Sequence, residues 1–102
     1  MEQIGEGRAS PLRLSIVTPS GIPADISCDS VVLPVADDPD GTPGGTVGIR
    51  LGHMPALFVL SSGTVVARLE GRTVLRATVA AGLAAVRDNV VCVLADEASV
   101  EK

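Results

Sequence analysis

His53 is the chain's one histidine, and histidine is the side chain best suited to acid–base catalysis or metal binding near neutral pH. A catalytic role would require a nucleophilic serine and an orienting aspartate, but the sequence contains no GxSxG motif or other nucleophile signature. A metal site would require further His, Cys or carboxylate ligands, and the nearest candidates belong to a separate acidic loop. These observations favour a histidine that shapes a loop or lines an interface, and they leave a small hydrolase using His53 and a serine as one hypothesis.

The acidic loop, residues 35–45 (VADDPDGTPGG), is the other stretch whose residue types could bind a ligand. Asp37, Asp38 and Asp40 have the spacing of part of a calcium-binding loop, but no glutamate follows where it would close the loop. Residues 41–45 are glycine-rich like a phosphate-binding loop, but no Lys-Ser/Thr pair follows and two prolines remove backbone donors. We therefore expect no metal or nucleotide here, and the loop is either a solvated acidic surface or a patch that faces a partner.

The composition limits the class of protein. The formal net charge is −4 and aromatic residues make up 1%, which argues against the basic patches and stacking aromatics of a nucleic-acid surface. No apolar run approaches the roughly 18 residues that span a bilayer, and the N-terminus has no apolar signal core. Cys28 and Cys92 are far apart and lack CxxC spacing, so two free thiols in a reducing compartment are expected, with a disulfide as the alternative. The sequence thus predicts a soluble cytosolic protein, or one that a partner holds at a membrane.

The segments that must position these residues alternate between apolar and polar side chains, which is the period of a half-buried β-strand. Since 46% of the residues are hydrophobic and so few are aromatic, the core must consist of Val, Leu, Ile and Ala, with Phe58 packed behind His53. Strands are predicted over residues 12–16, 22–28, 31–33, 47–51, 56–60, 65–69, 73–79 and 90–94, with tight turns at 18–21, 70–72 and 88–89. Short strands at such close spacing predict an all-β sandwich or barrel.

Three further segments need separate interpretation. The alanines of residues 79–86 (VAAGLAAV) favour a helix, whereas Gly82 counts against a helix interior, so both helix and strand remain open on these residues alone. Residues 1–11 are predicted to form a flexible N-terminal arm. Residues 97–102 are predicted to form a short C-terminal tail, which is too short for a stable helix of its own.

Several stretches, taken in order, match a known family. They are LSIVTPSG (14–21), DSVVLP (29–34), GHMPAL (52–57), Leu60 and Gly63, GL (82–83), VRDN (86–89) and VCVLADEA (91–98). Over about residues 12–98 the chain resembles the N-terminal domain of the ATP synthase epsilon subunit. The resemblance implies a flattened β-sandwich of roughly eight to ten short, mostly antiparallel strands over residues 12–96. It also implies that residues 79–86 are strands meeting at a turn near residues 81–82.

The resemblance further implies a non-catalytic part of a rotary F-type ATP synthase. In that family the domain lies at the foot of the central stalk, binds the gamma subunit and the polar loops of the membrane c-ring, and helps couple ion-driven rotation to ATP synthesis. This implies no cofactor, no direct membrane insertion, and a peripheral location on the cytoplasmic face of the bacterial inner membrane. The positions that match the family's glycine-histidine-x-proline turn, near the gamma contact, are Gly52, His53, Met54 and Pro55. The candidates for the acidic residue that faces the c-ring are Asp37, Asp38 and Asp40.

Three departures from the family pattern matter. Leu51 stands where the family usually has proline before Gly-His, and the link over residues 35–50 is several positions longer than the family's. The chain stops at Lys102, whereas bacterial members usually add a two-helix C-terminal hairpin that can bind ATP and inhibit the catalytic head. We therefore expect neither property, and the alternative function is a stand-alone β-sandwich binding or regulatory module derived from the epsilon subunit.

Overall fold

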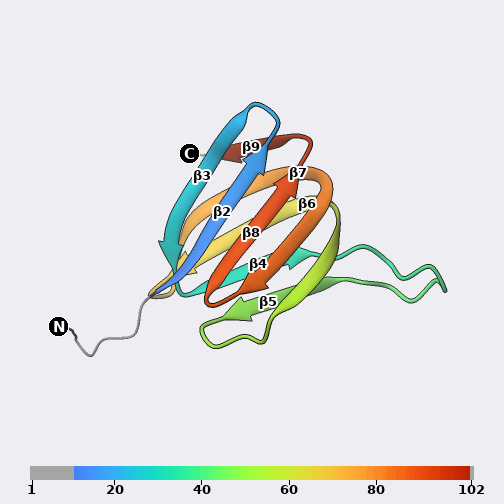
Figure 1. Ribbon diagram of the computed structural model, residues 1–102, viewed down its shortest axis with the longest axis horizontal. Coiled ribbons are helices and arrows are strands. Elements are labelled where there is room, and N and C mark those ends of the chain that lie inside the picture. Colours follow the sequence, from blue (N-terminus) through green and yellow to red (C-terminus); the bar gives the residue numbers. More distant parts are fainter. Residues whose placement is uncertain (1–10, 102) are drawn as a thin grey trace.

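The computed structural model describes residues 11–101, and the regular structure in this range consists of strands alone. The strands, labelled in Figure 1, are β2 (Leu12–Thr18), β3 (Gly21–Cys28), β4 (Ser30–Pro34), β5 (Thr46–Arg50), β6 (Ala56–Leu69), β7 (Arg72–Arg87), β8 (Val90–Ala95) and β9 (Ala98–Glu101). The all-β prediction is therefore confirmed. Within the described residues no helix is long and apolar enough to cross a membrane. The predicted N-terminal arm lies outside these residues except for Pro11, and most of the predicted tail forms β9.

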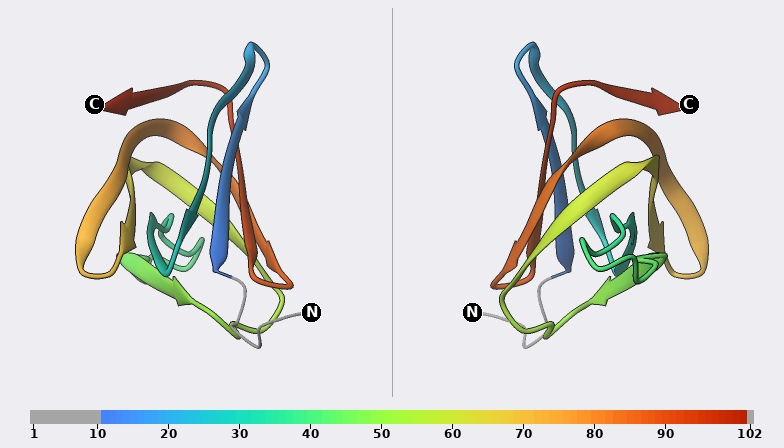
Figure 2. Two further views of the ribbon diagram at one scale, coloured as in Figure 1. Left: turned by 90° about the vertical axis from the view of Figure 1, so that its left-hand side faces the viewer. Right: turned by 90° about the vertical axis from the view of Figure 1, so that its right-hand side faces the viewer.

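The strands form one hydrogen-bonded sheet that folds over on itself into two layers. Their order is β3-β2-β8-β7-β6-β4-β5, with β9 also paired to β7. All pairs are antiparallel except β2 with β8. The two longest strands, β6 with 14 residues and β7 with 16, curve from one layer into the other (Figure 2). The first layer contains β3, β2, β8, the end of β7 and the start of β6; the second contains β5, β4, β9 and the remaining halves of β6 and β7. The predicted sandwich is confirmed.

β7 passes between the two layers at a bend formed by Ala81 and Gly82, whose φ angles are 74° and 156°. A Cβ atom on Gly82 would collide with the carbonyl oxygen of Leu94 on β8 and lie 3.1 Å from the Cα of Ala95. Only glycine allows this close approach of two backbones. Residues 79–86 are therefore strand, and the turn expected near residues 81–82 is a bend within one continuous strand. The bend lies where the partner of β7 changes from β9 to β8.

The core between the layers is built from small aliphatic side chains, as the composition predicts. In the described residues no polar or charged side chain is buried. Phe58 and Ile26 pack against this core and remain partly exposed. Ile22, at the start of β3, is 62% exposed because the β2–β3 hairpin extends beyond the second layer (Figure 2). The largest fully buried side chains are Leu12, Leu14, Ile16, Val31, Leu33, Ile49, Leu60, Val65, Val79, Val86, Val91 and Val93.

Two local predictions from the sequence are also confirmed. Asp88 and Asn89, with φ angles of 51° and 64°, form the tip between β7 and β8 in the left-handed conformation that a two-residue hairpin requires. Cys28 is buried, Cys92 is half-buried on the outer side of β8, and both are free thiols. The structure therefore has no disulfide between these two residues.

Candidate functional site

The outer surface of the first layer carries rows of aliphatic side chains. Two adjacent rows cross β6, β7 and β8, with Val59, Leu83 and Leu94 in one and Leu57, Ala85 and Cys92 in the other. Side chains that lie directly opposite each other on one face of a sheet have Cβ atoms about 4.5–5.5 Å apart, so the rows form one continuous surface. We call these six residues the apolar face.

The apolar face is open to solvent. The exposed fractions are 67% for Leu57, 59% for Val59, 40% for Leu83 and 49% for Leu94. Single exposed aliphatic residues are ordinary on protein surfaces, but adjoining rows of them mark an interaction surface. Charged residues border the rows: Arg13 on β2, which is paired to Asp25 at 2.8 Å, and Arg87 on β7. An apolar centre with a charged rim is the usual anatomy of a protein–protein interface.

The turn between β5 and β6, residues 51–55, extends the apolar face at the start of β6. Met54 is 77% exposed and Leu51 is 42% exposed, and the chain continues from this turn directly to Leu57. Gly52 has a φ of 79°, a left-handed conformation that glycine adopts without strain. The turn at residues 51–55, which contains the predicted Gly-His-x-Pro positions, therefore lies beside the exposed aliphatic rows and adds Leu51 and Met54 to them.

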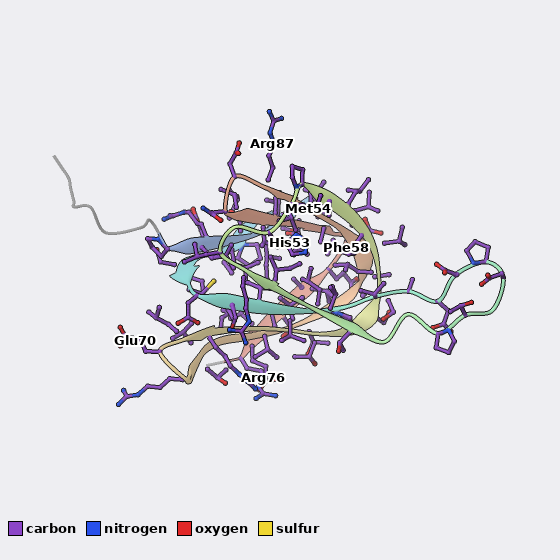
Figure 3. All side chains as sticks on the ribbon, turned by 90° about the horizontal axis from the view of Figure 1, so that it is seen from below. His53, Met54, Phe58, Glu70, Arg76 and Arg87 are labelled. Atoms are coloured by element: carbon purple, nitrogen blue, oxygen red, sulfur yellow. The ribbon has the colours of Figure 1, made fainter. Side chains whose placement is uncertain are left out.

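His53 stabilises this turn from within. Its backbone N–H donates to the carbonyl oxygen of Arg50 at 3.2 Å, and its ring Nδ1 lies 2.7 Å from the carbonyl oxygen of Met54. Because a carbonyl oxygen can only accept, Nδ1 must carry a proton. The ring also contacts Phe58 edge-to-face, with centroids 6.3 Å apart and planes at 62°. Figure 3 shows the side chains of His53, Met54 and Phe58 near one another. The histidine thus joins the turn to the edge of the core.

The surroundings of His53 do not favour catalysis or metal binding. Within the described chain the ring hydrogen-bonds to a backbone carbonyl and to no serine or threonine hydroxyl. In residues 11–101 no three His, Cys, Asp or Glu side chains are close enough to hold a metal ion. Three shallow grooves of about 440, 490 and 520 Å³ lie near β9 and the β2–β3 tip, and His53 lines none of them. The geometry supports packing of the turn as the role of this residue.

The acidic loop connects β4 to β5 and extends away from the sandwich (Figure 1). Oδ1 of Asp37 accepts a hydrogen bond from the N–H of Gly44 at 3.0 Å, and Oδ1 of Asp40 accepts one from the N–H of Thr42 at 2.9 Å. The bond from Thr42 lowers the pKa of the Asp40 carboxyl, which is therefore ionised at neutral pH. The side chain of Asp38 is exposed and hydrogen-bonds to no other residue of the described chain. The loop is an ordered hairpin that presents carboxylates to solvent.

The two sets of predicted site residues lie apart. The acidic loop precedes β5 and the turn at residues 51–55 follows it, so the two lie at opposite ends of this strand (Figure 1). A strand of five residues is about 16 Å long, so the aspartates and His53 do not form one site. The acidic loop and the turn at residues 51–55 are therefore two separate candidate surfaces.

The apolar face was not among the predicted sites, although the sequence contains a signal for it. Leu57 and Val59 occupy positions at which strict alternation would place polar side chains, and residues 56–60 read as an uninterrupted apolar run. Leu83 and Leu94 break the alternation in the same way. Strands that are apolar on both sides are typical of sheets covered on both sides, and residues 11–101 cover only one side here.

The chain has relatives of known family. A model of the ATP synthase delta/epsilon chain β-sandwich domain matches residues 11–101. The chain is 30% identical over 89 residues to the chloroplastic ATP synthase epsilon chain of Nephroselmis olivacea, with 87% of this chain and 61% of the relative covered. It is 34% identical over 85 residues to the ATP synthase epsilon chain of Granulibacter bethesdensis, with 83% and 58% covered. The chain therefore spans about three fifths of the length of these two relatives.

Two solved structures contain chains with the same fold. A chain in the Euglena gracilis mitochondrial ATP synthase (OSCP/F1/c-ring, rotational state 1) matches with a TM-score of 0.74 at 18% identity, covering 98% of this chain and 60% of that one. A chain in the central stalk and c-ring of the Tetrahymena thermophila mitochondrial ATP synthase matches with a TM-score of 0.65 at 14% identity, covering 85% and 64%. At these identities the likeness shows that the fold is shared.

Proposed function

Because the chain belongs to the family of the ATP synthase delta/epsilon chain β-sandwich domain, we propose that it is a non-catalytic, epsilon-type subunit of a rotary ATP synthase. In this role it sits in the central stalk and helps transmit ion-driven rotation to the sites of ATP synthesis. Two relatives at 30% and 34% identity are epsilon chains, which supports the assignment. The absence of converging titratable side chains around His53 in the described residues fits a subunit that works through its surfaces.

The apolar face carries this proposal, and the gamma subunit is its proposed occupant. The face needs a partner that buries aliphatic side chains over a flat surface bordered by arginine and aspartate. The turn at residues 51–55, which matches the family's position near the gamma contact, continues this surface through Met54. Removing such side chains from water contributes about 25 cal/mol per Å² of apolar area, from which the entropy lost on association is subtracted.

The acidic loop is the proposed contact with the c-ring. It extends from the opposite end of β5, so one subunit can bind gamma with its apolar face and the ring with Asp37, Asp38 or Asp40. Attraction between such exposed carboxylates and basic loops is modest and weakens with salt. Through these contacts the subunit is held on the cytoplasmic face of a bacterial membrane, without direct insertion.

The test is to purify the chain and the gamma subunit of the same organism and pass their mixture through a sizing column at micromolar concentration. We expect one peak that contains both proteins, and we expect it to persist when the salt concentration is raised, because burial of aliphatic side chains is not screened. The matched control is a variant in which Leu57 and Val59 are both replaced by lysine, which should elute separately from gamma.

Separate elution of the wild-type chain from gamma at low salt would contradict the proposal. A folded chain that does not bind gamma would then favour the alternative, a stand-alone binding module built on the same sandwich. A circular dichroism spectrum typical of β-structure, recorded on the same sample, ensures that the chain is folded in either case.

A further inference from the structure

Asn89 connects three segments that are distant in the sequence. It lies at the tip between β7 and β8 and has a φ of 64°. Its Oδ1 accepts a hydrogen bond of 2.7 Å from the N–H of Gly52, a residue 37 positions earlier. Its backbone carbonyl oxygen accepts a second hydrogen bond, 2.9 Å long, from the N–H of Arg13 at the start of β2. One residue thus joins the β7–β8 tip, β2 and the turn at residues 51–55.

The turn at residues 51–55 depends on this link. The other hydrogen bonds recorded in the described chain for this turn are local, from His53 to the carbonyl oxygens of Arg50 and Met54. They shape the turn, and the His53 ring packs it on Phe58 of the adjoining strand β6, but none of these contacts reaches the β7–β8 hairpin. The bond from the N–H of Gly52 to Asn89 is the one that attaches it to a neighbouring hairpin.

We propose that Asn89 is a positioning residue for the gamma-binding surface, because its hydrogen bond to Gly52 holds the turn at residues 51–55 in a fixed position beside the apolar face. This inference rests on the proposed function. With the turn attached, Met54 and the start of β6 meet the partner as part of one preformed surface, and less conformational entropy is lost on binding. Without the attachment, the turn must be ordered when gamma binds.

Asparagine meets two requirements at this position. The tip needs a residue that tolerates a left-handed backbone, and the turn needs a side-chain acceptor of this length. Glycine meets the first requirement only, and alanine meets neither. Aspartate meets both, so Asn89→Asp is expected to keep the link.

The experiment compares Asn89→Gly with Asp88→Gly in the full chain. Both variants suit the left-handed tip, since Asp88 has a φ of 51°, but only the first removes the bond to Gly52. Within residues 11–101 Asp88, at the tip beyond the last pair of β7 and β8, makes only an exposed contact with Arg87 at 3.5 Å, which contributes little. We expect Asn89→Gly to weaken gamma binding about 5- to 10-fold, measured by calorimetry, and Asp88→Gly and Asn89→Asp to leave it within about 2-fold.

A second measurement reports on the link without gamma. Amide hydrogen exchange of Gly52, followed by NMR on the isolated chain, should accelerate about 10-fold in Asn89→Gly and stay unchanged in Asp88→Gly. The thermal midpoints of the two variants should be nearly equal, which separates positioning from a general loss of stability.

Unchanged exchange at Gly52, or equal gamma affinity of Asn89→Gly and wild type, would overturn the inference. Failure of the wild-type chain to bind gamma would instead overturn the proposed function, and the exchange measurement would still decide whether Asn89 holds the turn.

Discussion

On the first layer β6 presents Leu57 and Val59 to solvent, whereas farther along the same strand, on the second layer, it presents Thr64, Val66 and Arg68. β7 changes in the same way across its bend, from Arg76 before it to Leu83 after it. The outer surface of the second layer, which we call the arginine face, contains Arg50, Ser30 and Arg68 in one row and Val32, Val66 and Arg76 in the next. Two strands thus supply two unlike surfaces.

The difference favours the apolar face as the one that binds the proposed partner. Among the described residues, the large hydrophobic side chains that are exposed are Ile22, Leu51, Met54, Leu57, Val59, Val74, Leu83, Val90 and Leu94. Of these, only Val74 belongs to the arginine face. Val32 and Val66 are half-buried between long arginine side chains, whose aliphatic stems can lie over neighbouring apolar residues. The arginine face therefore exposes little large hydrophobic surface to water, whereas the apolar face exposes several large hydrophobic side chains.

The largest effect is expected from breaking the bend that separates the two faces. In Gly82→Ala the new Cβ would collide with the backbone carbonyl of Leu94, which cannot move without disrupting β8. We expect a loss of about 3 kcal/mol or more in the free energy of unfolding, measured by urea denaturation.

The matched control is Gly48→Ala on the arginine face. A Cβ at Gly48 would meet no atom within 4 Å, so the change should stay within about 0.5 kcal/mol. Equal stability of the two variants would mean that the bend does not require glycine.

The next largest effect is expected in the affinity for gamma, compared between a variant on the apolar face and a variant on the arginine face. Leu57→Lys places a charge in the apolar face at a position that is 67% exposed, so the fold should tolerate it. If gamma covers this face, the affinity should fall about 100-fold, because the ammonium group must lose its water without gaining a partner.

Arg68→Glu, which reverses a charge on the arginine face, should change the gamma affinity less than about 3-fold. Both affinities can be measured by calorimetry on the same preparation of gamma. A larger loss in Arg68→Glu than in Leu57→Lys would reverse the assignment of the two faces.

The sequence predicted the strands better than the surfaces. Alternation predicted a half-buried strand over residues 12–16, because one-sided burial has a period of two, and Leu12, Leu14 and Ile16 are its buried side chains. The tip at residues 88–89 followed from the backbone preferences of Asp and Asn. Alternation cannot tell an outward side chain in solvent from one under a partner, so the apolar face was missed. The link from Asn89 to Gly52 could not be predicted either, since it depends on a contact across 37 positions.

A smaller effect is expected in the reactivity of the two cysteine thiols, since Cys28 lies on the inner side of the first layer and Cys92 on its outer side. Burial raises the pKa of the Cys28 thiol, with a smaller contribution from the Asp29 carboxylate. The neutral thiol is therefore favoured in the folded state, and its contribution to stability is complete below the pKa of the unfolded chain and is lost as the pH rises through the folded pKa. At neutral pH Cys28 should not react with iodoacetamide until the chain unfolds.

Cys92, half-buried in the apolar face, should react slowly in the free chain and about 10-fold more slowly in the complex with gamma, as mass spectrometry of the labelled peptides would show. Protection of Cys92 by gamma without any change at Cys28 is the expected result. Equal labelling of Cys92 with and without gamma would place the partner elsewhere.

The smallest effect is expected from a substitution that tests whether the acidic loop and the apolar face bind different partners. Asp38→Asn removes one charge from the loop, and in the described chain the Asp38 side chain makes no hydrogen bond that the change would break. If the loop faces a basic ring, binding of the chain–gamma complex to detergent-purified c-ring should weaken about 2- to 3-fold at low salt, and the difference should vanish at high salt. Gamma affinity should be unchanged, because the loop and the turn at residues 51–55 lie at opposite ends of β5. A salt-independent loss, or a loss of gamma binding, would show that the loop and the apolar face do not serve separate partners.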